Sequence, residues 1–116
     1  MIAYILPACS TCQRILKEVA WKGKIHDIKV NGVPSALLDK LRQDQGSYES
    51  LFSRRAMKYK SMGLKEKTLT ENDYKKLILE EYTFLKRPVF LVKDQTFVGN
   101  SKKVVAELKT YLENNG

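Results

Sequence analysis

The chain has 116 residues, 43% hydrophobic and 29% charged, a composition typical of an ordinary globular protein that forms one domain over residues 1–116. No apolar run is long enough to cross a bilayer and the N-terminus lacks a signal-peptide pattern, so we expect no membrane association and a cytoplasmic location. The net charge of +8 fits an anionic substrate, an acidic protein, nucleic acid or simply a soluble surface, but no helix-turn-helix or interleaved aromatic–basic pattern predicts direct DNA binding.

The chain opens with a predicted strand, a turn and a helix. Residues 2–6 (IAYIL) form an apolar run typical of a strand, and the next two residues predict a turn. A helix over residues 13–21 is predicted from four apolar residues at helical spacing, Ile15, Leu16, Val19 and Ala20. Residues 25–30 predict a second strand, in which Ile28 and Val30 share one face.

The middle of the chain, residues 34–84, predicts a helical insert. Ser35 is expected to cap its first helix. Residues 47–62 predict one or two short helices, with four candidates for burial, Leu51, Phe52, Met57 and Tyr59. Thr70 and Asp73 have the spacing of a capping box, which predicts the start of another helix.

The last third predicts a hairpin and a helix. Residues 89–92 and 96–98 read as two strands joined by a tight turn. Ser101 is expected to cap a final helix, and residues 114–116 are expected to fray. The order β-α-β, several helices, then β-β-α predicts an α/β protein of the thioredoxin-like class, with a mixed four-stranded sheet and a helical insert between its halves.

The only two cysteines, Cys9 and Cys12, lie between the first strand and the first helix. A zinc site would need two more ligands, and with one histidine and no further cysteine we expect no metal. A structural disulfide across so small a loop would stabilise little, and an inert buried pair is the remaining alternative. The pattern favours redox chemistry, in which Cys9 is the nucleophile at the positive end of the helix and Cys12 resolves the adduct. Backbone N–H groups that converge here, at Ser10 and Thr11, can also hold an oxyanion.

Arg87 and Pro88 form the second informative pair. The general preference of X-Pro bonds predicts a trans peptide, but thioredoxin-like folds place a cis-proline beside the active cysteine. We therefore expect cis-Pro88, with Arg87 near Cys9. The alternative is an ordinary strand-opening proline that follows a solvated arginine.

A basic segment, residues 54–67, holds six lysines and arginines against a single acid, Glu66. Its first members, Arg54 and Arg55, allow two interpretations. In the first, one of the two arginines reaches over the cysteine and holds an anion by the bidentate geometry of its guanidinium. In the second, both arginines belong to a solvated charged turn.

The chain resembles the arsenate reductase (ArsC)-like family, which includes the Spx regulators. The resemblance covers nearly the whole chain and rests on four stretches, residues 7–12, 52–64, 86–89 and 97–99. It implies a thioredoxin-like core with a helical insert, Cys9 as the reactive cysteine and Arg87 beside it. In the glutathione- and glutaredoxin-coupled arsenate reductases of this family, the cysteine forms an adduct with arsenate that several arginines hold.

Four positions depart from the arsenate reductase pattern. Ile5 and Leu6 replace the usual His-Asn, Gln13 replaces an arginine, Ser53 stands at the place of the first anion-binding arginine, and residues 99–101 lack the last one. The loop is therefore better equipped to form a disulfide than to grip arsenate.

The sequence thus predicts a thiol-dependent oxidoreductase that acts on a small thiol or oxyanion substrate. Cys9 attacks, Cys12 resolves, and Arg87 with Arg55 stabilises negative charge beside Pro88. No bound cofactor is expected, and glutathione or a redoxin (glutaredoxin or thioredoxin) would supply electrons. The alternative is an Spx-like redox-responsive regulator that binds RNA polymerase, which the basic segment and Arg55 favour. A third interpretation is a family member with a reactive thiol and no dedicated substrate.

Overall fold

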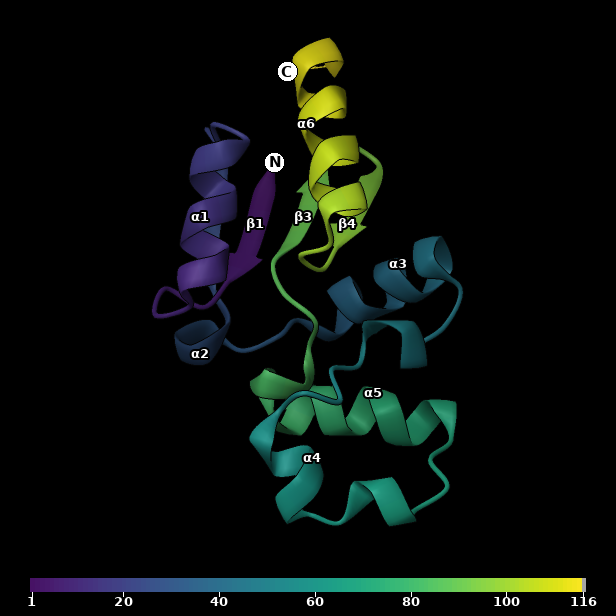
Figure 1. The fold of residues 1–116 in the computed structure, drawn as a ribbon. Coiled ribbons are helices and arrows are strands. Elements are labelled where there is room, and N and C mark those ends of the chain that lie inside the picture. Colours follow the sequence, from purple (N-terminus) through teal and green to yellow (C-terminus); the bar gives the residue numbers. More distant parts are fainter. Residues whose placement is uncertain (116) are drawn as a thin grey trace. The chain divides into compact units, whose positions relative to one another are not determined.

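The computed structural model describes residues 1–115 and divides into two compact units (Figure 1). The sheet unit comprises Met1–Val30 and the chain from Arg87 onward, and the helical unit comprises Asn31–Lys86. The helical unit coincides with the predicted insert, residues 34–84, to within a few residues. That both units form a single domain stays a prediction.

The sheet unit contains one mixed sheet of four strands, β1 (Ile2–Ile5), β2 (Lys24–Asp27), β3 (Val89–Val92) and β4 (Gln95–Val98). Their order is β2-β1-β3-β4. β1 and β2 run parallel, whereas β1 with β3 and β3 with β4 are antiparallel. This topology confirms the predicted α/β class and the four-stranded mixed sheet.

Helices α1 (Ser10–Glu18) and α6 (Lys102–Asn115) pack against one face of this sheet. The buried core between them consists of Ala3, Ile5, Cys12, Ile15, Val19, Phe90, Val92, Val105 and Leu108. Ser101 Oγ accepts a hydrogen bond from the Val104 N–H at 3.2 Å, so the predicted cap of α6 is confirmed. The helix continues through Asn115, where the sequence predicted fraying, and Gly116 lies outside the described residues.

The second strand is shorter than predicted. It ends at Asp27, whose carboxylate accepts hydrogen bonds from the N–H groups of Lys29 (2.9 Å) and Val30 (3.3 Å). These bonds turn the chain into the short helix α2 (Ile28–Asn31). Ile28 is consequently buried while Val30 is 77% exposed, so the prediction that the two share a strand face is wrong.

The helical unit contains three α-helices and three short 3-10 helices among its described residues, namely α3 (Ser35–Gln45), η1 (Glu49–Leu51), α4 (Met57–Ser61), η2 (Leu64–Glu66), α5 (Glu71–Glu80) and η3 (Tyr82–Phe84). The capping box of α5 is confirmed, because Thr70 and Asp73 exchange hydrogen bonds of 2.8 and 3.3 Å. The prediction for Ser35 is wrong: Pro34 occupies the N-cap, and Ser35 is the first helical residue.

Phe52 is the centre of the core of the helical unit. Its ring stacks on Phe84 at 4.8 Å and meets the edges of Tyr74 at 5.1 Å and Tyr59 at 6.0 Å. The burial predicted for Leu51 and Phe52 is confirmed, but Met57 is 89% exposed. Across residues 1–115, the structure contains no helix with the length and apolarity needed to span a membrane.

Candidate active site

The cysteine loop, Leu6 to Cys12, joins the end of β1 to the start of α1. The Cys9 N–H donates to the Leu6 carbonyl at 2.9 Å and closes a turn after the strand. The Cys9 carbonyl then accepts the first helical hydrogen bond, from the Gln13 N–H, at 3.1 Å. Cys9 is therefore the N-cap residue of α1, in extended conformation, and the helix begins at Ser10, three residues earlier than predicted.

The two cysteines occupy different environments, and neither forms a disulfide. Cys12 is completely buried and belongs to the core between the sheet and α1. Cys9 is half-buried and packs at the edge of the same core. Of the two sulfurs, Cys9 is therefore the more accessible from solvent, and its role as the nucleophile stays a prediction.

The pKa of the Cys9 thiol lies below its ordinary value as the net result of opposing influences. Partial burial is the largest single influence and raises the pKa, but it is outweighed by hydrogen bonds from the backbone and thiol of Cys12, the charge of Arg87 and the backbone of Thr11. Although the sulfur does not cap α1 with a bond of good geometry, N–H groups of the first helical turn lie close enough to stabilise a thiolate.

Burial raises the pKa of the Cys12 thiol to about 11. The backbone of Leu6 acts against this rise, while the hydrogen bond and the negative charge of Cys9 add to it. The charge of Arg87 lowers the pKa of Cys12 as well. Of the two thiols, Cys9 therefore ionises at the lower pH, and Cys12 keeps its proton.

Arg87 and Pro88 lie next to the cysteine loop. The Arg87–Pro88 peptide bond is cis, as predicted. Tyr4 pairs with Val89, so the register places Pro88 beside the end of β1 that leads into the loop. Pro88 is buried, and the Nε of Arg87 is buried as well. Because the charge of Arg87 acts on both sulfurs, the structure brings together Cys9, Cys12 and Arg87 within the sheet unit.

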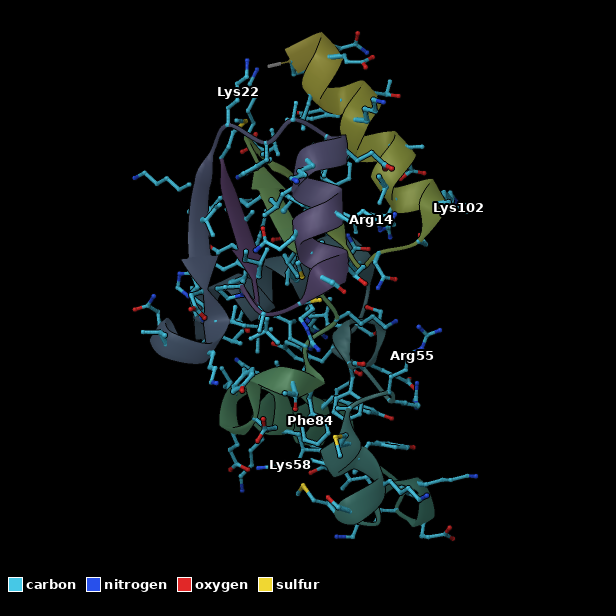
Figure 2. All side chains as sticks on the ribbon, turned by 60° about the vertical axis from the view of Figure 1, so that its left-hand side comes forward. Arg14, Lys22, Arg55, Lys58, Phe84 and Lys102 are labelled. Atoms are coloured by element: carbon cyan, nitrogen blue, oxygen red, sulfur yellow. The ribbon has the colours of Figure 1, made fainter. Side chains whose placement is uncertain are left out.

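The remaining predicted site residues differ in their surroundings. Ser10 is exposed and Thr11 is half-buried on the first turn of α1. Arg54 is engaged inside the helical unit, where it pairs with Glu49 at 2.7 Å and donates to the Tyr74 hydroxyl at 3.2 Å. Arg55 is exposed, and its side chain extends outward from the ribbon (Figure 2). Of the two arginines, only Arg55 is available for an anion, and its approach to Cys9 stays a prediction.

Sequence reasoning missed two contributions to the loop. The Gln13 side chain donates from Nε2 to the Pro7 carbonyl at 3.1 Å and holds the turn that precedes Cys9. The backbone of Leu6 stabilises the Cys12 thiolate. Gln13 stood out in the sequence only as a missing arginine, and a backbone contribution from Leu6 has no side-chain signal. Within the described part of the chain, no group of three or more His, Cys, Asp or Glu residues is placed to hold a metal ion.

Comparisons with known proteins agree with this architecture. The sequence profile of the ArsC family matches residues 4–108. A possible arsenate reductase from Streptococcus mutans is 25% identical, with a TM-score of 0.70 over 87% of this chain and 90% of that chain. An arsenate reductase from Vibrio cholerae is 18% identical, with a TM-score of 0.76 over 92% and 95% of the two chains.

A third solved structure, a candidate ArsC-family-related protein from Bacteroides fragilis, is 23% identical, with a TM-score of 0.77 over 92% of this chain and 95% of that chain. None of the curated proteins matches this chain in sequence. The similarity to these structures extends over nearly the full length of each, so it includes the helical unit as well as the sheet.

Proposed function

This chain belongs to the ArsC family, and from that premise we propose that it is a thiol-dependent oxidoreductase in which Cys9 forms a covalent adduct and Cys12 releases it. The family and the fold support thiol-dependent oxidoreductase chemistry in general. The observation that carries the finer proposal is the asymmetry of the two thiols, because a half-buried sulfur of lowered pKa lies beside a buried sulfur whose pKa is raised to about 11.

The substrate we favour is a small disulfide, since the loop offers one nearby guanidinium, from Arg87, instead of the several arginines that hold arsenate in the related enzymes. The Cys9 thiolate attacks one sulfur of the disulfide and forms a mixed disulfide, and the other half of the substrate leaves as a thiolate. Arg87 stabilises the negative charge of the attacking and leaving sulfurs.

Formation of the mixed disulfide also prepares Cys12. The negative charge on Cys9 disappears, and with it two of the influences that raise the pKa of Cys12. The charge of Arg87 and the backbone of Leu6 remain and favour the Cys12 thiolate. Cys12 then loses its proton to solvent and attacks the Cys9 sulfur. The second half of the substrate leaves as a thiolate, and the Cys9–Cys12 disulfide forms.

The cycle closes by reduction of that disulfide. Two electrons are required, and two glutathione molecules or one reduced redoxin, such as glutaredoxin or thioredoxin, supply them. We assign Ser10, Thr11 and Pro88 to contact with the substrate beside the attacking sulfur. Of the two adjacent arginines, Arg55 is the one that can bind an anion, because its guanidinium is exposed while that of Arg54 pairs with Glu49.

Reduction of bis(2-hydroxyethyl) disulfide by glutathione, followed through NADPH and glutathione reductase, tests this proposal. Wild-type protein is expected to turn over, Cys9→Ser to fall to background, and Cys12→Ser to accumulate a mixed disulfide on Cys9 that mass spectrometry detects. A parallel assay with arsenate, glutathione and glutaredoxin measures the oxyanion reaction. Absence of turnover in both assays, or retained turnover in Cys9→Ser, would refute the proposal.

A redox-responsive regulator that binds RNA polymerase is the second candidate. The observation that favours it is the exposure of Arg55 in a basic segment, together with a pair of thiols one helical turn apart that an oxidant such as hydrogen peroxide, itself reduced to water, can convert to a disulfide. In this case the protein should bind purified RNA polymerase with an affinity that changes when Cys9 and Cys12 are oxidised. Equal binding of oxidised protein, reduced protein and Cys9→Ser would exclude a redox-controlled regulator.

A further inference from the structure

Gln13 bonds to the chain on both sides of Cys9. Its backbone N–H donates to the carbonyl of Cys9 at 3.1 Å, as the first hydrogen bond of α1. Its side-chain amide reaches back six residues and donates from Nε2 to the carbonyl of Pro7, also at 3.1 Å. A single residue therefore holds the backbone that precedes the proposed nucleophile and the backbone that follows it.

The turn that Gln13 holds, Pro7-Ala8, depends on hydrogen bonds more than on packing. Both of its residues are exposed, so the core does not fix them. One hydrogen bond closes the turn from the Cys9 N–H to the Leu6 carbonyl at 2.9 Å, and the bond from the Gln13 side chain to Pro7 is the second. Of these two bonds, only the second is made by a side chain, so a substitution can remove it without changing the backbone.

The position of Cys9 decides which groups act on its sulfur. Hydrogen bonds from the backbone of Thr11 and from the backbone and thiol of Cys12 favour its thiolate, and so does the charge of Arg87. The first two residues belong to the first turn of α1, whereas Arg87 lies just before β3, so the sulfur must keep its place with respect to both. Hydrogen bonds weaken steeply as their geometry worsens. A loosened turn would therefore weaken the influences that outweigh the partial burial of Cys9.

The start of α1 differs from the starts of two other helices. At α5 the Thr70 hydroxyl accepts the Asp73 N–H, and at α6 the Ser101 hydroxyl accepts the Val104 N–H. Among its described residues, α1 has no side-chain cap and no acidic residue in its first turn. Because neither a cap side chain nor a carboxylate takes them, the first N–H groups of α1 remain available to a thiolate at Cys9. The position of Cys9 thus determines how well they are used.

We propose that Gln13 is a positioning residue, which sets the reactivity of Cys9 by holding the Pro7-Ala8 turn against the start of α1. This inference rests on the proposed function in one respect, that Cys9 is the attacking thiol. Gln13 acts through its hydrogen bond to Pro7 and needs no contact with the substrate. The alternative is a solvated glutamine on an exposed part of α1, whose substitution would leave Cys9 unchanged.

The pH profile of Cys9 alkylation by iodoacetamide, followed by mass spectrometry of the Cys9 peptide, tests this role. Gln13→Met keeps the length of the side chain and removes its donor. We expect its profile to shift to higher pH, with alkylation at pH 7 about 2- to 10-fold slower, the range that corresponds to one hydrogen bond. Gln43→Met, which makes the same change at an exposed position of α3, is the matched control and should react like the wild type.

Gln13→Arg separates positioning from charge. Arginine restores an N–H donor that can reach the Pro7 carbonyl, but its positive charge also favours a nearby thiolate. About 1 M salt shortens the Debye length to about 3 Å, so the contribution of the charge should largely disappear there while that of the hydrogen bond remains. At this salt concentration, Gln13→Arg should react like the wild type and Gln13→Met should stay slower.

Turnover of bis(2-hydroxyethyl) disulfide with glutathione keeps this inference distinguishable from the proposed function. If the wild type turns over, kcat/KM should fall in Gln13→Met together with the alkylation rate. If the wild type does not turn over, the proposed function fails, and the alkylation profiles still decide the role of Gln13. The inference is overturned if Gln13→Met, with a fold that circular dichroism shows to be intact, keeps the wild-type profile, or if Gln43→Met shifts the profile as much. A loss of stability in Gln13→Met with an unchanged profile would likewise leave Gln13 a structural residue only.

Discussion

The two units of this protein place positive charge in contrasting surroundings. In the sheet unit, the Arg87 guanidinium, with its Nε buried, acts on two thiols, one of which is fully buried. In the helical unit, Lys58 and Glu81 form a 2.7 Å ion pair, but the lysine side chain is 59% exposed. Water screens the second interaction more than it screens the interaction of Arg87 with the fully buried Cys12. The same kind of charge is therefore expected to contribute more to the thiols of the sheet unit than to the stability of the helical unit.

Removal of the central aromatic ring of the helical unit gives the largest expected effect. Phe52→Ala deletes stacking on Phe84 and the edge contacts with two tyrosines, so it should lower the free energy of unfolding by about 3–5 kcal/mol. Urea unfolding followed by circular dichroism measures the loss.

The comparison of the units adds a second readout to this variant. Because the Cys9 environment is built within the sheet unit, the pH profile of Cys9 alkylation in folded Phe52→Ala should match that of the wild type. A shifted profile would show that the helical unit contributes to the reactivity of the thiol. The conservative variant Phe52→Leu, which keeps most of the apolar volume, should lose less stability and serves as the control.

The buried thiol should make stability depend on alkaline pH. The folded state raises the pKa of Cys12 to about 11, so it holds a proton that the unfolded chain releases near its ordinary value, about 8.5. Its contribution is fully present below the unfolded pKa and is lost as the pH rises through the folded pKa. Wild type should therefore lose about 1–3 kcal/mol more than Cys12→Ala between pH 8.5 and pH 11, measured by urea unfolding. Parallel loss in the two proteins would contradict the raised pKa.

The sequence predicted the parts of this molecule that local pattern controls. Continuous apolar runs and helical spacing located the strands and most helices, and the capping box of Thr70 and Asp73 marked a helix start to the residue. The prediction failed where one side chain redirects the backbone, as when Asp27 turns the second strand into α2. It also failed for Met57, because helical spacing alone does not tell which face of a five-residue helix meets the core.

For the candidate site, the residue types were predictable and their environments were not. Two cysteines at this spacing, and an arginine before a proline, indicated which groups would meet. The burial of Cys12 and the influence of the Leu6 backbone depend on how α1 packs on the sheet. Likewise, the sequence does not tell which of Arg54 and Arg55 is available for an anion. The structure does, because Glu49 neutralises Arg54.

Neutralising Arg87 should have a moderate effect on the thiols. In Arg87→Gln the pKa of Cys9 should rise, because a charge that favours its thiolate is lost, and iodoacetamide should alkylate Cys9 about 3- to 10-fold more slowly at pH 7. Arg55→Gln, which removes the same charge from an exposed position in the other unit, is the matched control and should leave the alkylation rate unchanged. Equal slowing in both variants would mean that net charge, and not the placement of Arg87, controls the thiol.

The smallest effect is expected from Lys58–Glu81, one of the two shortest ion pairs among the described residues. Lys58 approaches Glu81 as closely as any ion pair described in this structure, yet solvent surrounds its ammonium group and the side chain must give up rotational freedom to hold the contact. Lys58→Ala should therefore shift the midpoint of urea unfolding by no more than the scatter between repeated measurements, with no change in Cys9 alkylation. A clear loss of stability would show that this pair is shielded from water. The two units would then differ only in the group that each cation faces, a thiol beside Arg87 and a carboxylate beside Lys58.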